Sequence, residues 1–141
     1  MPIRPPEFDD LIEKLKPTLV NRPAIIIAIT GQLGHGKTTF GRFLAWYFNA
    51  SLIETDFYLI PFEGINIDTS KISPLIDKRL NNAQPIIVEG YGILEALSNL
   101  RRSPNIIIHV QQEEDIPLSP FHDPKEWGFE QVPRYILRTT H

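Results

Sequence analysis

The stretch ITGQLGHGKTTF, residues 29–40, decides the fold of this chain of 141 residues. Within it, residues 31–38 match the pattern G-x-x-x-x-G-K-[ST] in full. The match lies after an apolar run typical of a buried strand and before a stretch with helical spacing, which is the context that a phosphate-binding loop requires. A random chain of this length would carry the pattern at roughly the one per cent level or below. The stretch therefore predicts a nucleotide phosphate site.

The chemistry of such a loop explains the spacing of its residues. The three glycines let the backbone turn sharply with its N–H groups facing inward, and the helix that follows adds its positive end. Lys37 is expected to reach the β- and γ-phosphate oxygens of ATP, and Thr38 to bind Mg²⁺. His35 either touches a phosphate or points outward, and the outward position is favoured. The residues expected to bind the nucleotide are Gly31, Gln32, Leu33, Gly34, His35, Gly36, Lys37, Thr38 and Thr39.

The composition predicts a single globular domain over residues 1–141. Hydrophobic residues make up 42% of the chain, the formal net charge is -3, and there is no cysteine. This balance gives no electrostatic case for a nucleic-acid partner, and the lack of cysteine fits a reducing, cytoplasmic compartment. The longest apolar run, residues 24–29, is far too short to span a bilayer, so no membrane partner is expected. Residues 1–6 lack the order of a signal peptide.

Short β-branched runs recur along the chain, and each of the clearest ones follows a proline. They are AIIIAIT after Pro23, IIVEG after Pro85, NIIIHV after Pro104 and RYILRTT after Pro133. Because proline is tolerated at the first position of a strand, these runs predict strands. The first three are nearly continuous apolar stretches, as expected in a parallel sheet covered on both faces. Residues 51–55 are a shorter fifth candidate.

Stretches with helical spacing between these runs predict flanking helices, so we expect a three-layer α/β fold with right-handed crossovers. Residues 1–22 should hold an opening helix, ended by Pro17, and a linker. Residues 111–133 carry no assigned element, and their length suggests a lid or loop. The apolar faces of the predicted helices are Phe8, Leu11, Ile12 and Leu15; Phe40, Phe43, Leu44, Tyr47 and Phe48; Leu75, Ile76 and Leu80; and Ile93, Leu94, Leu97 and Leu100.

A translation-factor type of GTPase is the first rival, because GHGKTT occurs in such proteins as well. The other parts of that signature are missing, since the chain has neither D-x-x-G after a strand nor N-K-x-D for the guanine base. The pattern thus favours another class of nucleotide-binding protein.

Beyond the loop, the chain resembles a known family. After ITGQLGHGKTTF come TDFY at residues 55–58 and IVEGYGIL at residues 87–94. Their order and placement resemble the P-loop kinases of the uridine kinase, phosphoribulokinase and pantothenate kinase group, over about residues 25–109. The resemblance implies a mostly parallel five-stranded sheet in the order 2-3-1-4-5. It also implies transfer of the γ-phosphoryl group of ATP to a hydroxyl of a nucleoside-like or other small molecule.

The resemblance further implies roles for particular residues. Asp56 would receive the proton of the acceptor hydroxyl and help to hold Mg²⁺, and Glu89 would orient metal-bound water. Tyr58 would line the acceptor pocket. Arg79, on the helix after Asp56, is a candidate cation for the substrate, although a surface position is the more frequent role of such an arginine.

The order of strands and loops supports this site independently of the family. Ligands bind beyond the carboxyl ends of parallel strands, and Gly31, Asp56, Glu89 and Gln111 all fall at such ends. The carboxylates should therefore converge on the phosphates. The alternatives remain that Asp56 caps a turn, that Glu89 is a solvated strand end, and that Tyr58 belongs to the core.

The expected lid departs from the family pattern, in which arginines after the fourth strand neutralise the transferring phosphoryl group. Residues 111–133 contain no arginine, and Lys125 is their only basic side chain apart from His122. Two functions therefore stay open: a Mg²⁺–ATP kinase for a small-molecule acceptor, or a regulatory nucleotide-binding module with weak or no activity. The kinase is favoured because of the two carboxylates. The candidate cations are Arg134 or Arg138, then Arg79, then Lys125 carried inward by lid closure. An arginine from a second subunit of a homo-oligomer is the remaining route.

Overall fold

The protein is described by a computed structural model that covers residues 6–32, 36–64, 66–112 and 118–139. Its five strands form one sheet in the order β2-β3-β1-β4-β5, and every strand pairing is parallel. The predicted strand order and fold class are thus confirmed. The strands are β1 (Ile26–Gly31), β2 (Ser51–Glu54), β3 (Ile86–Glu89), β4 (Ile106–Gln111) and β5 (Arg134–Arg138).

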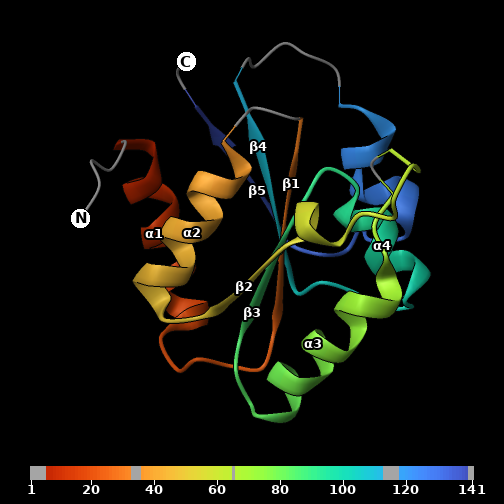
Figure 1. The fold of residues 1–141 in the computed structure, drawn as a ribbon. Helices are drawn as coiled ribbons and strands as arrows, with labels where there is room; N and C mark the ends of the chain where they lie inside the picture. Colours follow the sequence, from red (N-terminus) through yellow and green to blue (C-terminus); the bar gives the residue numbers. More distant parts are fainter. Residues whose placement is uncertain (1–5, 33–35, 65, 113–117, 140–141) are drawn as a thin grey trace.

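Helices cover both faces of the sheet. In Figure 1, α1 and α2 lie on one side of the strands, and α3 and α4 lie on the other. Short 3-10 turns follow β2 and β4. The helices are α1 (Pro6–Leu19), α2 (Lys37–Phe48), α3 (Thr69–Asn81) and α4 (Ile93–Asn99), and the 3-10 turns are η1 (Thr55–Tyr58), η2 (Pro120–His122) and η3 (Pro124–Trp127).

The central strand β1 shows why its sequence is apolar without alternation. Successive side chains of a strand point to opposite faces, and both faces of β1 are covered. Ile27 and Ile29 pack in the cluster under α1 and α2, whereas Ile26 and Ala28 pack in the cluster under α3 and α4. All four side chains are buried. The carboxyl end of this strand is therefore held rigidly where the phosphate loop begins.

Two details of the predicted helices are wrong. Helix α1 does not end at Pro17 but continues to Leu19, because Leu19 is buried in the core and a proline in the last turn removes only one hydrogen bond. In α3 the buried face is formed by Ile72 and Ile76, and Leu75 is 37% exposed.

Residues 118–133 of the predicted lid pack against α4 and the core cluster beneath it. The turns η2 and η3 contact α4, and Phe129 is buried in the cluster that α3 and α4 cover. The indole Nε1 of Trp127 donates a 3.0 Å hydrogen bond to the carbonyl oxygen of Pro120. Trp127 and Phe129 thus fix this segment to the core. Among the helices of the described ranges, none is long and apolar enough to cross a membrane.

Candidate active site

The phosphate loop joins β1 to α2 at the carboxyl edge of the sheet. Its residues 31–32 and 36–39 are described, while Leu33, Gly34 and His35 lie outside the described residues. Gly31 is required here because a β-carbon at this position would collide with the carbonyl oxygen of Val110 on β4. Helix α2 starts directly after the loop, and the Gly36 carbonyl accepts the Phe40 N–H at 3.0 Å. The loop therefore opens at the positive end of a helix, as predicted.

Lys37 lies folded back beneath the loop. Only 7% of the residue is exposed, and its Nζ donates a 2.9 Å hydrogen bond to the carbonyl oxygen of Gln32. Burial lowers the pKa of Lys37, and the negative charges of Glu89 and Asp56 oppose this effect. The ammonium group is thus held by the backbone of Gln32 in a buried position, where a phosphate group would compensate its lost hydration.

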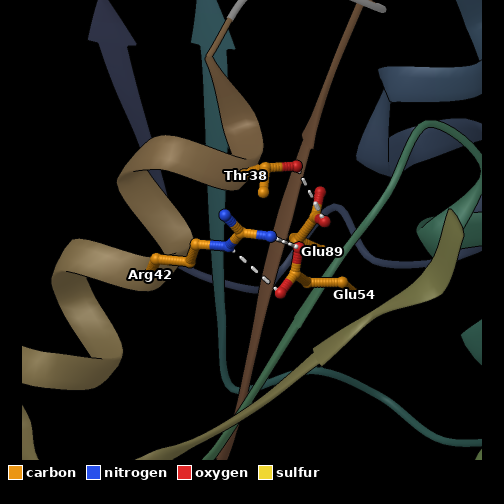
Figure 2. Close-up of polar contacts among 4 residues, drawn as sticks. All are labelled: Thr38, Arg42, Glu54 and Glu89. Atoms are coloured by element: carbon orange, nitrogen blue, oxygen red, sulfur yellow. Dashed lines mark hydrogen bonds and ion pairs between the residues drawn. The ribbon is translucent and has the colours of Figure 1, made fainter. Parts of the chain in front are cut away.

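Thr38 and Glu89 meet below the start of the helix. The Thr38 hydroxyl donates a 3.1 Å hydrogen bond to Glu89 Oε1, and Figure 2 shows the two side chains pointing toward one another. Glu89 is 1% exposed, and burial raises the pKa of its carboxyl group. The hydrogen bond from Thr38 and the charge of Lys37 lower that pKa, whereas the charges of Asp56 and Glu54 raise it further. The alternative of a solvated strand end is therefore wrong for Glu89.

The carboxyl ends of β2 and β3 are held together by one hydrogen bond and one close contact. The Thr55 hydroxyl donates a 2.8 Å hydrogen bond to the Glu89 carbonyl oxygen, and a β-carbon at Gly90 would overlap the Thr55 side chain. Only glycine permits this approach. As a result η1, which starts at Thr55, lies beside the backbone of Glu89 and Gly90. Asp56 is exposed on this turn, and its charge acts on both Lys37 and Glu89.

The two aromatic residues after Asp56 differ in their environment. Tyr58 is half-buried and packs against the core cluster under α3 and α4. Phe57 is 75% exposed. The structure thus supports the core interpretation for Tyr58 and leaves Phe57 open to solvent at the carboxyl edge.

An ion pair that was not predicted from the sequence lies beside the site. Arg42, one turn after Thr38 on α2, donates to both carboxylate oxygens of Glu54 at 2.8 and 3.2 Å. Glu54 is paired with Glu89 across β2 and β3, so two glutamates end adjacent strands, and Figure 2 shows Arg42 reaching Glu54 from the helix. The spacing of four residues from Thr38 and an acid at the end of a predicted strand were the available signals.

A second missed contact lies on the other side of β1. Thr30, the residue before the phosphate loop, shares a buried 2.7 Å hydrogen bond with Nδ1 of His122 from η2. The ring of His122 also stands edge-on to Tyr91, with centroids 4.7 Å apart. The segment after β4 is therefore tied to the strand that carries the loop. No sequence spacing indicates a contact between residues so far apart.

Most of the arginines considered as cations lie far from the carboxyl edge of the sheet, where the loop is. Arg79 lies in the last turn of α3, and its carbonyl oxygen accepts the Gln84 N–H just before β3, so it lies at the amino edge of the sheet. A neighbouring ion pair between Asp77 and Arg102 lies at the same edge. Arg134 starts β5 at that edge too, whereas Arg138 ends β5 in register with Gln111. Arg138 alone among them reaches the carboxyl edge.

The side chains beside the loop can be compared with the ligands that different metals need. Within the described ranges, no group of three or more His, Cys, Asp or Glu residues could hold a metal ion. Mg²⁺ prefers oxygen ligands, and it takes few of them from the protein when phosphates and water supply the others. The hydroxyl of Thr38 and the carboxylate of Glu89, which are hydrogen-bonded to each other, carry oxygen atoms of this kind.

Comparisons with known proteins agree with this architecture. No family model and no curated protein matches the chain. Among solved structures, a sugar kinase from Janibacter sp. HTCC2649 matches with a TM-score of 0.52 and 14% identity, over 82% of this chain and 86% of that one. A gluconokinase from Sinorhizobium meliloti 1021 gives a TM-score of 0.49 and 17% identity, over 84% of this chain and 85% of that one. The chain therefore shares the fold of the Janibacter sugar kinase.

Proposed function

We propose that the protein is an ATP-dependent kinase that phosphorylates a hydroxyl group of a small molecule. One observation carries the proposal: Thr38 of the G-x-x-x-x-G-K-[ST] motif is hydrogen-bonded to the buried Glu89, and the lysine of the same motif is buried. A hydroxyl, a carboxylate and an ammonium group in this arrangement are what binding and transfer of a nucleotide phosphate require. The fold shared with a sugar kinase supports the same reaction class.

The proposed reaction moves one phosphoryl group. The acceptor hydroxyl oxygen forms a bond to the γ-phosphorus of ATP, the bond from that phosphorus to the β–γ bridging oxygen breaks, and ADP leaves. The proton of the acceptor hydroxyl passes to Asp56, which is exposed to an incoming acceptor. Lys37 binds the phosphate oxygens on which charge accumulates. The negative charge of Asp56 raises the pKa of Lys37, which supports placing the base on the same side of the sheet as the lysine.

Mg²⁺ belongs to this proposal as a cofactor held by Thr38 and Glu89, with Asp56 as a further carboxylate. Its chemistry would be to neutralise charge on the β- and γ-phosphate oxygens. Glu89 supports this assignment, because a buried carboxylate beside two other acids gains from a nearby cation.

The kinase group, the cellular location and the partners of the protein are also part of this proposal. TDFY and IVEGYGIL favour the uridine kinase, phosphoribulokinase and pantothenate kinase group, in which the acceptor is a nucleoside or another small metabolite. A cytoplasmic location is supported by the chain having no cysteine. We further propose that the protein binds a small-molecule acceptor and has no nucleic-acid or membrane partner. It is also proposed to form a homo-oligomer.

The test is a turnover screen with ATP and Mg²⁺ against nucleosides, pantothenate-like alcohols, sugars and sugar phosphates. The Lys37→Ala protein serves as the blank. We expect ADP release that depends on one class of acceptor and on Lys37. Nucleotide binding without turnover for any acceptor would overturn the kinase proposal.

A regulatory nucleotide-binding module is the second candidate, and one observation favours it. Residues 111–133 contain no arginine, and Arg79 and Arg134 lie at the amino edge of the sheet. Cations that neutralise the transferring phosphoryl group are worth about three to five orders of magnitude in rate where they have been removed. Arg138 or an arginine from a second copy would have to supply this charge. If Arg138→Ala leaves turnover unchanged in a monomer, the cation comes from neither source.

A further inference from the structure

A polar cavity of about 320 Å³ lies between α4 and the segment that follows η1. Its volume is at the lower end of the range for small-molecule sites, about 300–1,000 Å³. Ile60 lies in one wall, four residues after Asp56, and Gly92 lies in the other, three residues after Glu89. Both walls therefore belong to segments that follow a proposed carboxylate within four residues of the chain.

The wall after η1 is held in a defined shape. Leu59 and Ile67 form an antiparallel bridge, and the Ile60 N–H donates to the Asn66 carbonyl at 2.8 Å. The Asp68 N–H donates to the Tyr58 carbonyl at 2.6 Å, which anchors the returning strand to η1. This wall is thus fixed to the turn that carries Asp56.

The cavity lining is rich in groups that suit hydroxyls. Asn66, Thr69 and Asn99 each carry donors and acceptors, and the carboxylate of Glu95 accepts hydrogen bonds. Glu95 and Asn99 are four residues apart and so lie on one face of α4. No lysine, arginine or histidine lines the cavity among the described residues. An anionic ligand would meet a negative charge and no compensating cation.

We propose that this cavity, the α4 cavity, binds the part of the acceptor that is remote from its reacting hydroxyl. The acceptor is then an uncharged sugar or polyol, without a carboxylate or phosphate group. This inference rests on the proposed kinase function, because the reacting hydroxyl must reach Asp56. Hydroxyls satisfy both the amides and the carboxylate, whereas an acid placed beside Glu95 is repelled.

The experiment compares ligands that differ only in charge. Sorbitol and gluconate have the same carbon chain with an alcohol or an acid at one end, and ribitol and ribonate form a second such pair. Binding to the full chain is measured by calorimetry in the presence of Mg²⁺ and a non-hydrolysable ATP analogue. We expect at least one polyol to bind, and its acid to bind about tenfold more weakly or worse.

Two variants test the role of the lining. Glu95→Gln keeps the shape and should reduce the discrimination against the acid, and Asn99→Lys adds a cation and should increase the affinity for the acid. Glu126→Gln on η3, an exposed glutamate outside the cavity, is the matched control and should leave the ratio unchanged. Acids that bind as tightly as polyols, a ratio that does not respond to Glu95→Gln, or no polyol binding at all would each overturn the inference.

Turnover assays separate this inference from the kinase proposal. Phosphorylation of an acid in a reaction that needs Lys37 would overturn the α4 cavity assignment and support the kinase. Polyol binding that discriminates through Glu95, without any phosphoryl transfer, would support the cavity and contradict the kinase.

Discussion

Gly90 and Thr55 pack so closely that a side chain larger than hydrogen at position 90 has no room beside the threonine hydroxyl. The same hydroxyl is hydrogen-bonded to the carbonyl oxygen of Glu89. Asp56 follows one member of this contact directly in the chain, and Glu89 precedes the other. The contact therefore sets the spacing of the two carboxylates on which the proposed site depends.

Gly90→Ala should destabilise the protein by about 1–3 kcal/mol, because its methyl group must displace Thr55 in a well-packed region. In a Thr55→Ala background the same change should cost clearly less, since the obstructing hydroxyl is gone. Chemical denaturation of the four proteins of this double-mutant cycle measures the difference. Equal costs in both backgrounds would show that the close contact is not formed.

Lys37→Ala should abolish most of the rise in melting temperature that Mg²⁺–ATP or ADP produces. A ligand at a hundred times its Kd stabilises the folded state by about 2.7 kcal/mol, so the wild-type shift is easily measured. Lys125→Ala, which removes an exposed lysine from η3, is the control and should keep the shift. A Lys37→Ala protein that responds to nucleotide like the wild type would remove the phosphate site.

Asp56→Asn should retain the nucleotide-induced shift but lose about a hundredfold or more of its turnover. The amide preserves the shape of the side chain, yet it cannot accept the proton of the acceptor hydroxyl. The same replacement at Asp10, an exposed position on α1, should leave turnover intact. Unchanged kcat in Asp56→Asn would exclude this residue as the base.

Glu89→Gln should stabilise the nucleotide-free protein at neutral pH by about 1 kcal/mol, as replacements in functional sites often do. Because the folded state raises the pKa of Glu89 above 4.5, the folded protein binds more protons than the unfolded chain in the window above that value. The contribution of this group to stability thus decreases as pH rises through the window. The advantage of glutamine should disappear below about pH 4.5. The test is to measure the unfolding free energies of the wild type and of Glu89→Gln across pH. A difference between the two proteins that does not change with pH would contradict the prediction.

Arg42→Met should lower the melting temperature more than Glu54→Gln does. Without the guanidinium group, Glu54 stays charged beside Glu89, whereas the glutamine removes one of the two charges. The double variant should therefore be more stable than Arg42→Met alone. Thermal unfolding without nucleotide gives the melting temperatures of the three variants. If the change in the double variant equals the sum of the two single changes, the ion pair does not offset this repulsion.

Much of the fold could be predicted from local sequence. Proline followed by β-branched residues marked the strands, and the continuous apolar runs near Ile27 and Ile107 reflected burial on both faces. The length of α1 could not be predicted from Pro17, because burial of Leu19 outweighs the missing hydrogen bond. Local preference gives way where tertiary packing adds more free energy.

The candidate site divides in the same way. Lys37, Thr38 and Glu89 followed from a motif and from strand ends, since parallel strands bring their carboxyl ends to one edge. The contacts of Arg42 with Glu54 and of His122 with Thr30 depend on how helices and turns pack across the sheet. For the first contact, the position of Arg42 one turn after Thr38 and the acid at a strand end were partial signals, whereas the second contact leaves no spacing that a motif could describe.

The position of β1 in the middle of the sheet has a consequence for how the chain folds. Ile26 pairs with Ile86 and Ile27 pairs with Ile106, so the partners of this strand are synthesised long after it. Closing such large chain loops costs entropy before any pairing repays it, which makes folding slow in sheets of this topology. The helices on either side of β1 in the chain, α1 and α2, cover one of its faces, whereas the other face is covered by α3 and α4, which follow later. The strand that carries the phosphate loop is thus an apolar segment that stays without its strand partners until β3 and β4 have been made, which favours aggregation during synthesis.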